Sequence, residues 1–375
     1  MKTALMTPIG DICQTGSGTT PSRERRDEFY GGSIPWVKSG ELRERVIHKT
    51  DETVTEAALH ATSLKPVPAG ALLVAMYGAT VGRVGMLGID ATTNQAVCHL
   101  IPDPKRVDRK YLFYALRAKA PDLIARSVGG AQPNISQSTI RRTEIYVPPL
   151  PAQRRIAAIL DEADSVRRAH SAALVKWERL ERSLFFNRFG NPLAKHRDSL
   201  PLGEHISLVN GRAYKQTELL DKGTPVLRIQ NLNGGDRWYY SDLNLPKDKY
   251  CDKGDLLFAW SASFGPYIWT GPRAIFHYHI WRLELRPTIE KMYAFWLLNI
   301  LSDEVKRSGR GISMTHATKG GMEKRMIPVP PIDAQRQFCK EIDHIHHIKA
   351  LQEEALLKQE ALFASLQYRA FRGEL

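Results

Sequence analysis

The apolar residues of this chain change their spacing along the sequence. In residues 150–190, and again after residue 331, they recur every three or four positions. This heptad spacing predicts two long helices, each with an apolar seam that packs on another helix. Each predicted helix has about 37 residues and is about 55 Å long at 1.5 Å per residue. The predicted seams comprise Ile159, Ala163, Val166, Trp177, Leu180 and Leu184 in the first helix, and Ile345, Ile348, Ala355, Leu362 and Leu366 in the second.

Both predicted seams are interrupted by a polar residue at the same heptad position, His170 in the first and Gln352 in the second. A buried polar side chain at such a position fixes the register of a helix pair at some cost in stability. The alternative is that both side chains lie at the rim of the seam and are solvated. The spacing alone leaves both interpretations open.

The regions before the two predicted helices have a different pattern. Short apolar runs such as 72–76 and 256–260 alternate with Gly, Asn and Pro. This pattern predicts small, mixed, strand-rich α/β domains. We expect one helix inside each domain, over residues 111–118 and 291–301.

The chain is an internal repeat. The segment Val147-Pro148-Pro149 with Gln153 returns as Val329-Pro330-Pro331 with Gln335, at a constant offset of 182 residues. Because a folded domain stands between the two predicted helices, they pair most simply if they run antiparallel. The predicted architecture is therefore two α/β domains at opposite ends of an antiparallel coiled coil, with pseudo-two-fold internal symmetry.

The repeat also predicts the domain boundaries. We expect the first variable domain in residues 1–145 and the first long helix in residues 146–190. The second variable domain, with a short linker, is expected in residues 191–328, and the second long helix in residues 329–375.

The net charge of the chain indicates a class of binding partner. The chain has 53 Lys and Arg residues against 40 Asp and Glu residues, a net charge of +13. Such an excess indicates a polyanionic partner, either nucleic acid or an acidic membrane surface. With 43% hydrophobic residues, the 375-residue chain has the composition of a globular protein and not of a disordered one.

The chain lacks the signals of other compartments and of metal scaffolds. Its four cysteines are scattered without a CxxC pair, so neither a disulfide framework nor a structural zinc site is expected. The N-terminal residues lack the apolar segment of a signal peptide, and no apolar stretch reaches the roughly 18 residues of a membrane span. We expect a soluble, cytoplasmic protein.

No catalytic motif is found in the sequence. The segment 78–83 has neither the spacing nor the lysine of a phosphate-binding loop, and 16–18 lacks the third glycine of a dinucleotide fingerprint. The carboxylates at Asp103 and Asp108 superficially resemble a nuclease metal site, but the gap between them is too short for the strands that such a site needs. The two Val-Pro-Pro segments lack the preceding Asn or Asp that adenine methyltransferases use. The chain is therefore expected not to be an enzyme on its own, and no cofactor is expected in it.

Two groups of histidines are the remaining candidate metal ligands. His344, His346 and His347 lie on the second predicted helix, while His277 and His279 alternate along a predicted strand. The other repeat carries no matching ligand set, which favours a solvated helix face and ordinary strand histidines. No metal site is predicted.

Several longer motifs resemble a known family. They are Gly18-Thr19-Thr20-Pro21-Ser22, Tyr77-Gly78-Ala79-Thr80-Val81-Gly82, the segment from Gly129 to Ser136, and the two Pro-Pro-x-x-x-Gln segments. Together with the repeat they resemble the specificity subunit of type I restriction-modification systems, over essentially the whole chain. The second repeat departs from the pattern, because residues 311–319 keep the glycine but lose the Gln-Pro-Asn-Ile core.

The resemblance implies a non-catalytic DNA-binding role. Two target-recognition domains would each read one half of a bipartite site in double-stranded DNA, and the helices would set the spacing and dock two methyltransferase subunits. Motor-nuclease subunits would complete the restricting complex. The resemblance places S-adenosylmethionine, ATP and Mg²⁺ on those partner subunits.

Reading of bases in the major groove requires Arg, Lys, Asn or Gln on exposed loops. For each candidate a solvated surface position is the alternative interpretation. The candidates are Lys38, Arg83, Gln132 and Asn134 in the first domain, and Arg212, Lys215, Arg228, Gln230, Asn231, Arg310 and Lys319 in the second.

Two other functions compete with this hypothesis. One is a fused nuclease or methyltransferase whose motifs have diverged, which the missing motifs argue against. The other is a coiled-coil scaffold without a nucleic-acid role, in which the basic excess is incidental.

Overall fold

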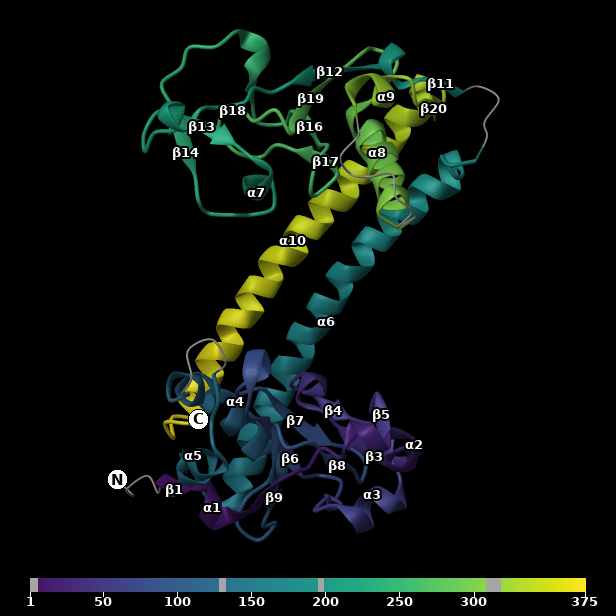
Figure 1. The fold of residues 1–375 in the computed structure, drawn as a ribbon. Coiled ribbons are helices and arrows are strands. Elements are labelled where there is room, and N and C mark those ends of the chain that lie inside the picture. The colour runs from purple at the N-terminus through teal and green to yellow at the C-terminus, as the bar shows by residue number, and fades with distance from the viewer. Residues whose placement is uncertain (1–5, 128–132, 195–198, 308–317) are drawn as a thin grey trace. The chain divides into compact units, whose positions relative to one another are not determined.

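The computed structural model describes residues 6–127, 133–194, 199–307 and 318–375 (Figure 1). The chain divides into two compact units. Unit 1 comprises Met1–Ser171 together with Glu354–Leu375, and unit 2 comprises Ala172–Glu353. Each of the two long helices, α6 (Leu150–Phe189) and α10 (Ile332–Ala370), therefore contributes one part to each unit.

The described residues of unit 1 form three β-sheets. A five-stranded sheet has the order β2-β9-β6-β7-β4, a three-stranded sheet has the order β5-β3-β8, and β1 pairs with β10. Most neighbours are antiparallel, but β4 and β7 are parallel, as are β3 and β8. The strands are β1 (Met6–Pro8), β2 (Cys13–Ser17), β3 (Tyr30–Val37), β4 (Val46–Ile47), β5 (Glu52–Val54), β6 (Leu72–Ala75), β7 (Val84–Leu87), β8 (Thr92–Thr93), β9 (Val97–Pro102) and β10 (Glu144–Tyr146).

Unit 2 repeats this arrangement. Its sheets have the orders β12-β19-β16-β17 and β14-β13-β18-β15, and β11 pairs with β20. The parallel pair β13·β18 corresponds to β3·β8 of unit 1. The strands are β11 (Ser199–Pro201), β12 (Ile206–Asn210), β13 (Thr224–Leu227), β14 (Tyr239–Ser241), β15 (Tyr250–Cys251), β16 (Leu256–Ala259), β17 (Gly265–Ile268), β18 (Ala274–Phe276), β19 (Ile280–Leu285) and β20 (Met326–Pro328).

Most of the other helices are short. Unit 1 contains α1 (Ile9–Ile12), α2 (Arg26–Phe29), α3 (Glu56–Ala61), α4 (Arg109–Ala125) and α5 (Gln137–Arg142), and unit 2 contains α7 (Ile229–Leu232), α8 (Lys291–Arg307) and α9 (Lys319–Glu323). The 3₁₀ turns are η1 (Arg23–Arg25), η2 (Ser39–Glu41), η3 (Gly78–Thr80), η4 (Leu202–Glu204), η5 (Gln216–Glu218) and η6 (Lys247–Lys249). The prediction of mixed, strand-rich α/β domains with long helices is confirmed.

Helices α4 and α8 occupy the two segments in which a helix was expected, and both are longer than predicted. Their bounds differ by the same 182 residues as the rest of the repeat. In unit 1 the Asp108 side chain accepts hydrogen bonds from the backbone N–H groups of Lys110 and Tyr111, which begins α4 three residues before the first strongly apolar position. Such an N-cap satisfies backbone donors that the helix itself cannot pair.

The glutamine of the Pro-Pro-x-x-x-Gln motif ties three segments of unit 1 together. Gln153 is fully buried, and its Nε2 donates to the carbonyl oxygens of Pro148 at 2.7 Å and Arg106 at 3.0 Å. Its Oε1 accepts from the backbone N–H of Asp108 at 2.7 Å. The side chain thus joins the start of α6 to the start of α4.

Gln335 makes the matching contacts in unit 2. Its Nε2 donates to the carbonyl oxygens of Pro330 and Thr288, and its Oε1 accepts from the backbone N–H of Glu290. The motif is therefore an anchor between each long helix and the domain that precedes it.

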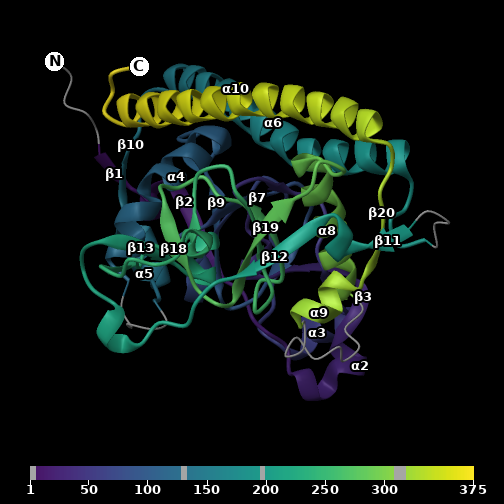
Figure 2. The same ribbon diagram turned by 90° about the horizontal axis from the view of Figure 1, so that it is seen from above.

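The halves of α6 and α10 that share a unit lie side by side and run antiparallel (Figure 2). In unit 1, Leu160 of α6 and Phe363 of α10 belong to one core. In unit 2, the rings of Phe185, near the end of α6, and Phe338, near the start of α10, are 5.7 Å apart. The antiparallel pairing that the sequence predicts is present in both units.

The buried face of these helices differs from the predicted seam. Ile159, Leu180, Ile348 and Leu362 are 36–48% exposed. The other predicted seam residues are partly buried: Ala163, Val166, Trp177, Leu184, Ile345, Ala355 and Leu366. The fully buried apolar residues are Ile156, Ala157, Leu160 and Phe185 on α6, and Phe338, Ile342, Phe363 and Ala370 on α10.

The reason is that each helix end packs on two neighbours. The heptad pattern assumes a single partner helix, whereas the buried residues belong to cores that also contain Tyr111 and Leu112 of α4 or Tyr293 and Leu297 of α8. The most buried stripe is rotated toward α4 and α8. The polar heptad residues are half-buried, and Gln352 Oε1 accepts a 2.5 Å hydrogen bond from Trp177 Nε1.

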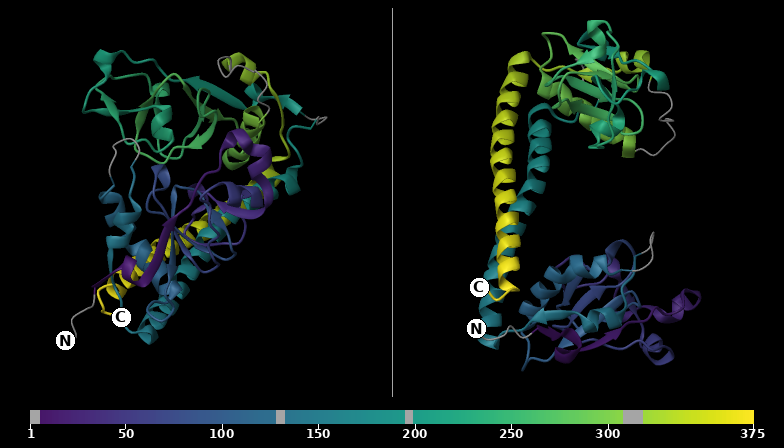
Figure 3. Two further views of the ribbon diagram at one scale, coloured as in Figure 1. Left: turned by 60° about the horizontal axis from the view of Figure 1, so that its bottom comes forward. Right: turned by 90° about the vertical axis from the view of Figure 1, so that its left-hand side faces the viewer.

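Strand β1 lies beside the C-terminal end of α10 within unit 1 (Figure 3). Met6 of β1 and Tyr368 of α10 line the same cavity of about 420 Å³. No helix among the described residues is long and apolar enough to cross a membrane.

Candidate nucleic-acid interface

Backbone hydrogen bonds gather four loops of unit 1 at one edge of its sheets. The turn 94–96, between β8 and β9, lies at the centre. Asn94 N–H donates to the Val37 carbonyl oxygen at 2.9 Å, and Met76 N–H donates to that of Ala96 at 2.8 Å. Ile135 N–H donates to the Met76 carbonyl oxygen at 2.9 Å. We call this surface the unit 1 edge; its side chains are Lys38, Tyr77, Gln95 and Asn134, together with Thr20, whose hydroxyl donates to Gln95 Oε1.

The same construction recurs in unit 2 around the turn 277–279, between β18 and β19. His277 N–H donates to the Leu227 carbonyl oxygen at 2.9 Å, and Trp260 N–H donates to that of His279 at 3.1 Å. Tyr278 N–H donates to the Arg212 carbonyl oxygen at 3.0 Å. We call this surface the unit 2 edge; its side chains are Arg212, Arg228, Trp260, His277, Tyr278 and His279.

A glycine makes the close approach at each edge possible. A Cβ on Gly18 would lie 1.8 Å from the Thr93 carbonyl oxygen, and a Cβ on Gly211 would lie 2.4 Å from that of Phe276. No larger residue fits there without moving the backbone. The two glycines bring the end of β2 or β12 against the central turn.

The basic residue of the unit 1 edge is held by a carboxylate. Lys38 Nζ lies 2.8 Å from Glu52 Oε1, and Arg23 Nη1 lies 2.7 Å from Glu52 Oε2. The hydrogen bond from Arg23, followed by that from Lys38, lowers the pKa of Glu52 to about 2. Because Glu52 is ionised at neutral pH, it orients both cations at the surface.

Two arginines of the unit 2 edge are held by aromatic rings and hydrogen bonds. Arg228 Cζ lies 4.1 Å from the centre of the Tyr239 ring, and its Nη2 donates to the Arg237 carbonyl oxygen. Arg212 Cζ lies 5.3 Å from the Tyr214 ring, and its Nη2 is 2.6 Å from Glu218 Oε1. Stacking and pairing of this kind restrict a guanidinium to one orientation before any ligand binds.

The remaining candidates fall into three groups. Arg83, Asn134, Lys215 and Gln230 are exposed, as is Lys319, whose Nζ lies 3.6 Å from Glu323 Oε1. Gln132 and Arg310 lie outside the described residues.

Asn231 forms the third group and corrects the prediction. It is buried, its Nδ2 donates to the carbonyl oxygens of Gly235 and Arg237, and its Oδ1 accepts from the backbone N–H of Arg228. Because the Nδ2 and Oδ1 groups of this buried amide both bind the backbone and shape the turn after β13, Asn231 presents no free donor to a DNA base.

The edges also contain residues that sequence reasoning missed. Gln95, Tyr77 and Tyr278 are exposed, and the Trp260 Nε1 donates to the Tyr278 carbonyl oxygen at 2.7 Å. His277 and His279 lie in the turn and not in a strand, with their ring centres 4.8 Å apart. Comparison of the two repeats could have identified these residues, because 94–96 and 277–279 occupy the same place between two buried strands.

The His277 environment predicts a pH effect on stability. Burial, followed by the nearby His279 and Arg228 charges, lowers the pKa of His277 to about 4 from an ordinary value of 6.5. The His277 imidazole therefore binds a proton more readily in the unfolded chain than in the folded one. Above pH 6.5 the imidazole is neutral in both states, and unit 2 has its full stability in this respect. As the pH falls from 6.5 towards 4, protonation of the unfolded chain lowers the free energy of unfolding.

This effect can be measured by urea unfolding of the full chain at several pH values. His277→Gln should flatten the decrease between pH 6.5 and 4. An unchanged slope in His277→Gln would contradict the assignment.

The candidate metal ligands on α10 do not form a site. No group of three or more His, Cys, Asp or Glu residues in the described part of the chain could hold a metal ion. His346 instead lies near a carboxylate, with its Nε2 3.6 Å from Glu181 Oε1.

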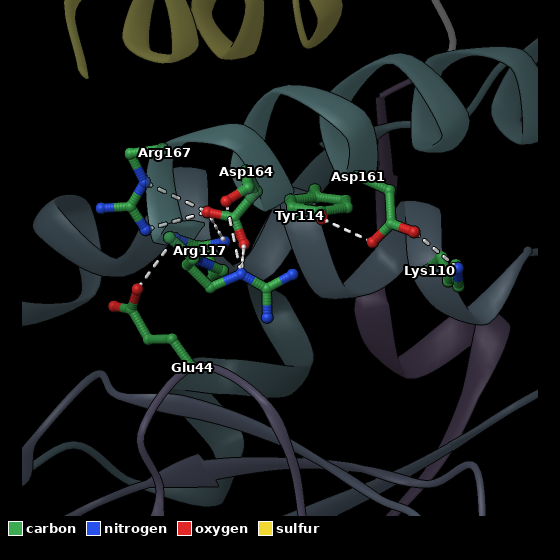
Figure 4. Close-up of polar contacts among 8 residues, drawn as sticks. Glu44, Lys110, Tyr114, Arg117, Asp161, Asp164 and Arg167 are labelled. Carbon is green, nitrogen blue, oxygen red and sulfur yellow. Dashed lines mark hydrogen bonds and ion pairs between the residues drawn. The ribbon is translucent and has the colours of Figure 1, made fainter. Parts of the chain in front are cut away.

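A buried ion network attaches the unit 1 sheets to α6 (Figure 4). Asp164 is 2% exposed, and its carboxylate contacts Arg117, Arg167 and Arg168 at 2.8–3.4 Å. Arg117 Nη2 also lies 2.9 Å from Glu44 Oε2, on the loop before β4. Nearby, Asp161 accepts from the Tyr114 hydroxyl at 2.9 Å and lies 2.7 Å from Lys110 Nζ. The network joins α4 and the loop before β4 to the adjoining half of α6.

Comparison with known proteins identifies a matching family. The model of the type I restriction modification DNA specificity domain matches residues 2–172 and 199–359. The specificity subunit of the type I restriction enzyme MjaIX from Methanocaldococcus jannaschii is 24% identical over 369 residues, which covers 88% of this chain and 84% of that protein.

Two solved structures share the fold of the chain. A chain from a structure of a type I restriction-modification system has a TM-score of 0.65 at 18% identity and covers 99% of this chain and 98% of its own length. The S subunit of a type I restriction-modification system from M. genitalium has a TM-score of 0.58 at 16% identity, with 99% and 97% covered.

Proposed function

Because the chain belongs to the family of type I restriction-modification DNA specificity subunits, we propose that its two edges each read one half of a bipartite DNA site. One observation carries this proposal: both edges are built on the same backbone framework but carry different side chains. Asn94, Gln95 and Ala96 stand in unit 1 where unit 2 has His277, Tyr278 and His279. Readers that differ in this way recognise different half-sites, so the whole site is asymmetric.

The residue types at the edges suit contact with duplex DNA. Arginine and lysine pair with guanine, asparagine and glutamine pair with adenine, and both kinds also bind phosphate. Arg212, Arg228 and Lys38 are oriented by fixed partners. We assign base or phosphate contact to these three residues and to the exposed Arg83, Asn134, Lys215, Gln230 and Lys319.

The long helices supply the spacing between the readers in this proposal. An α-helix of 40 residues is about 60 Å long. One turn of DNA spans about 34 Å, so readers joined by helices of this length engage half-sites separated by bases that are not read.

The helices also offer a docking surface for partners. Large apolar side chains stand exposed along the central parts of both helices, and such side chains are typical of a surface that another protein covers. In unit 2 these residues are Val175 and Leu180 on α6 with Ile348 and Leu351 on α10, and in unit 1 they are Leu357 and Leu362 on α10. We propose that two methyltransferase subunits bind there in the cytoplasm and that motor-nuclease subunits join them, with S-adenosylmethionine, ATP and Mg²⁺ on those partners.

The test is to co-express the chain with its methyltransferase subunit and map DNA methylation across a genome by single-molecule sequencing. Exchange of residues 1–145 for those of another specificity subunit should change one half of the methylated motif, and exchange of residues 200–326 should change the other half. A continuous motif that neither exchange alters would contradict the proposal.

Arg228 offers a prediction for a single side chain. Arg228→Ala should weaken binding to the specific site about 10-fold or more, because a positioned arginine on a base contributes about 1–3 kcal/mol. The control is Arg273→Ala, at the other end of β18, where the exposed guanidinium pairs with Asp252 at 3.0 Å. Fluorescence anisotropy with the methylated motif measures both affinities. Equal affinities for the two variants would remove Arg228 from the contact set.

A further inference from the structure

The attachment of each domain to the helices is built on equivalent positions in the two units. Tyr111 and Tyr293 donate from their hydroxyls to the carbonyl oxygens of Tyr146 and Pro328, 182 residues apart in each case. The anchors Gln153 and Gln335 obey the same offset. Side chains around α4 and α8 can therefore be compared position by position.

In unit 1 three aromatic rings form a cage around the Arg117 guanidinium at this junction; Figure 4 shows Arg117 with one of them, Tyr114. Arg117 Cζ lies 5.5 Å from the Phe113 ring, 5.6 Å from the Tyr114 ring and 5.2 Å from the Phe363 ring. Asp164 pairs with the same guanidinium. A buried arginine is stable here because rings and a carboxylate surround it.

Unit 2 retains two aromatic residues at the cage positions but not the arginine. Phe295 and Trp296 stand where unit 1 has Phe113 and Tyr114, while Asn299 replaces Arg117. Asparagine is several atoms shorter, and a cavity of about 610 Å³ lies here, lined by these three residues with Ile268, Met292 and Glu181 among others.

Two residues that line or adjoin the cavity each have a buried polar atom that forms no hydrogen bond with the described residues. Glu181 takes the position of Phe363 and is 4% exposed, and no described residue forms a hydrogen bond with its Oε1. Trp296 is 6% exposed, and its Nε1 likewise has no partner among the described groups. A buried carboxylate oxygen without a hydrogen bond is costly, so an arrangement that leaves one facing a cavity indicates a cationic ligand.

The other charges around the cavity leave this carboxylate available. Arg182 Nη1 is paired with Asp303 Oδ2 at 2.5 Å, and Arg179 and Lys349 also belong to the lining. His346 Nε2 is 3.6 Å from Glu181 Oε1, longer than a hydrogen bond. An anionic ligand would have to approach Glu181, whereas a cation placed as Arg117 is in unit 1 would lie against it.

We propose that this cavity in unit 2 binds a guanidinium group that does not belong to the chain, held between Phe295 and Trp296 and paired with Glu181. The group comes either from a free small molecule or from an arginine side chain of a docked methyltransferase subunit. In both cases the two units differ, because unit 1 fills its own cage and unit 2 requires a ligand.

The probe for the test is N-propylguanidine, with the uncharged N-propylurea as control. The full chain is labelled with ¹⁵N-tryptophan, and the Trp296 indole resonance is assigned through Trp296→Phe. N-propylguanidine should shift this resonance saturably, and N-propylurea should not. Absence of a saturable shift in the wild-type chain overturns the proposal.

Variants distinguish this site from general binding of a cation. Glu181→Gln should weaken binding of N-propylguanidine at least 10-fold, and Asn299→Arg should abolish it because the introduced arginine fills the cage as Arg117 does. Glu353→Gln, an exposed carboxylate on α10, is the matched control and should bind as the wild type does. Unchanged binding in both Glu181→Gln and Asn299→Arg would equally overturn the proposal, and the other indole resonances report whether each variant is folded.

Titration of the complex with the methyltransferase subunit separates the two sources. Loss of the N-propylguanidine shift in the complex assigns the cage to a partner arginine, and its persistence assigns it to a free ligand. Only this arm rests on the proposed function. Failure to assemble or to methylate DNA would contradict that function without affecting the titration of the chain alone.

Discussion

Replacement of Asp164 by alanine is expected to lower the free energy of unfolding of unit 1 by about 3–5 kcal/mol, the cost of removing one partner from a buried ion pair. The carboxylate is almost completely buried and holds three arginines. Arg117, 7% exposed, cannot reach water without leaving its aromatic cage. Its charge would therefore remain buried without Asp164.

Hydrogen exchange with peptide resolution measures this loss in the full chain. Protected amides of α4 and β9 should exchange faster in Asp164→Ala, while those of α8 and β19 should be unchanged. Asp161→Ala is the matched control, since this carboxylate lies one turn earlier on α6, is 42% exposed and pairs with Lys110. Its loss, which also removes the acceptor of the Tyr114 hydroxyl, should cost about 1–2 kcal/mol, less than the loss of Asp164.

A double variant tests whether the buried charge of Arg117 causes the loss of stability in Asp164→Ala. Because apolar residues of similar size often replace a buried ion pair without loss, Arg117→Met combined with Asp164→Leu should recover most of the stability. Similar losses in Asp164→Ala and Asp161→Ala would mean that burial of the network adds nothing.

The fold was largely predictable from the sequence because its main features are periodic. A heptad spacing, short apolar runs and a constant offset predict long helices, strand-rich domains and a duplication. The helix seam was predicted less well, because Leu160 and Phe363 face the domain core as well as the partner helix. A periodic pattern indicates that a helix has a buried face, but it does not show how many neighbouring elements bury that face.

The candidate interface was predictable only as a set of residue types. Backbone hydrogen bonds between distant segments, such as Asn94 with Val37 and His277 with Leu227, decide which side chains share an edge. Asn231 has the chemistry of a base reader, yet its position after β13 makes it a turn-forming residue. Composition and spacing do not encode such contacts, whereas comparison of the two repeats at 94–96 and 277–279 points to them.

The two anchor glutamines are expected to act independently. Gln335→Ala should lower the free energy of unfolding of unit 2 by about 2–4 kcal/mol, because three hydrogen bonds of a fully buried side chain are lost and the backbone groups of Thr288, Glu290 and Pro330 lose this partner. Gln153→Ala should have the same effect on unit 1, where the lost partners are Arg106, Asp108 and Pro148.

Hydrogen exchange of α4 and α8 in the full chain distinguishes the two effects. Gln335→Ala should speed exchange in α8 and leave α4 protected, and Gln153→Ala should do the reverse. Gln337→Ala is the control for Gln335→Ala, because this exposed side chain donates only to Glu341 and its loss should cost about 0.5 kcal/mol. If either glutamine variant opened both helices equally, the long helices would transmit the loss from one unit to the other, and the units would not fold as separate bodies. Selective opening means that each recognition domain is anchored by its own glutamine, so that one domain can change its sequence without weakening the attachment of the other.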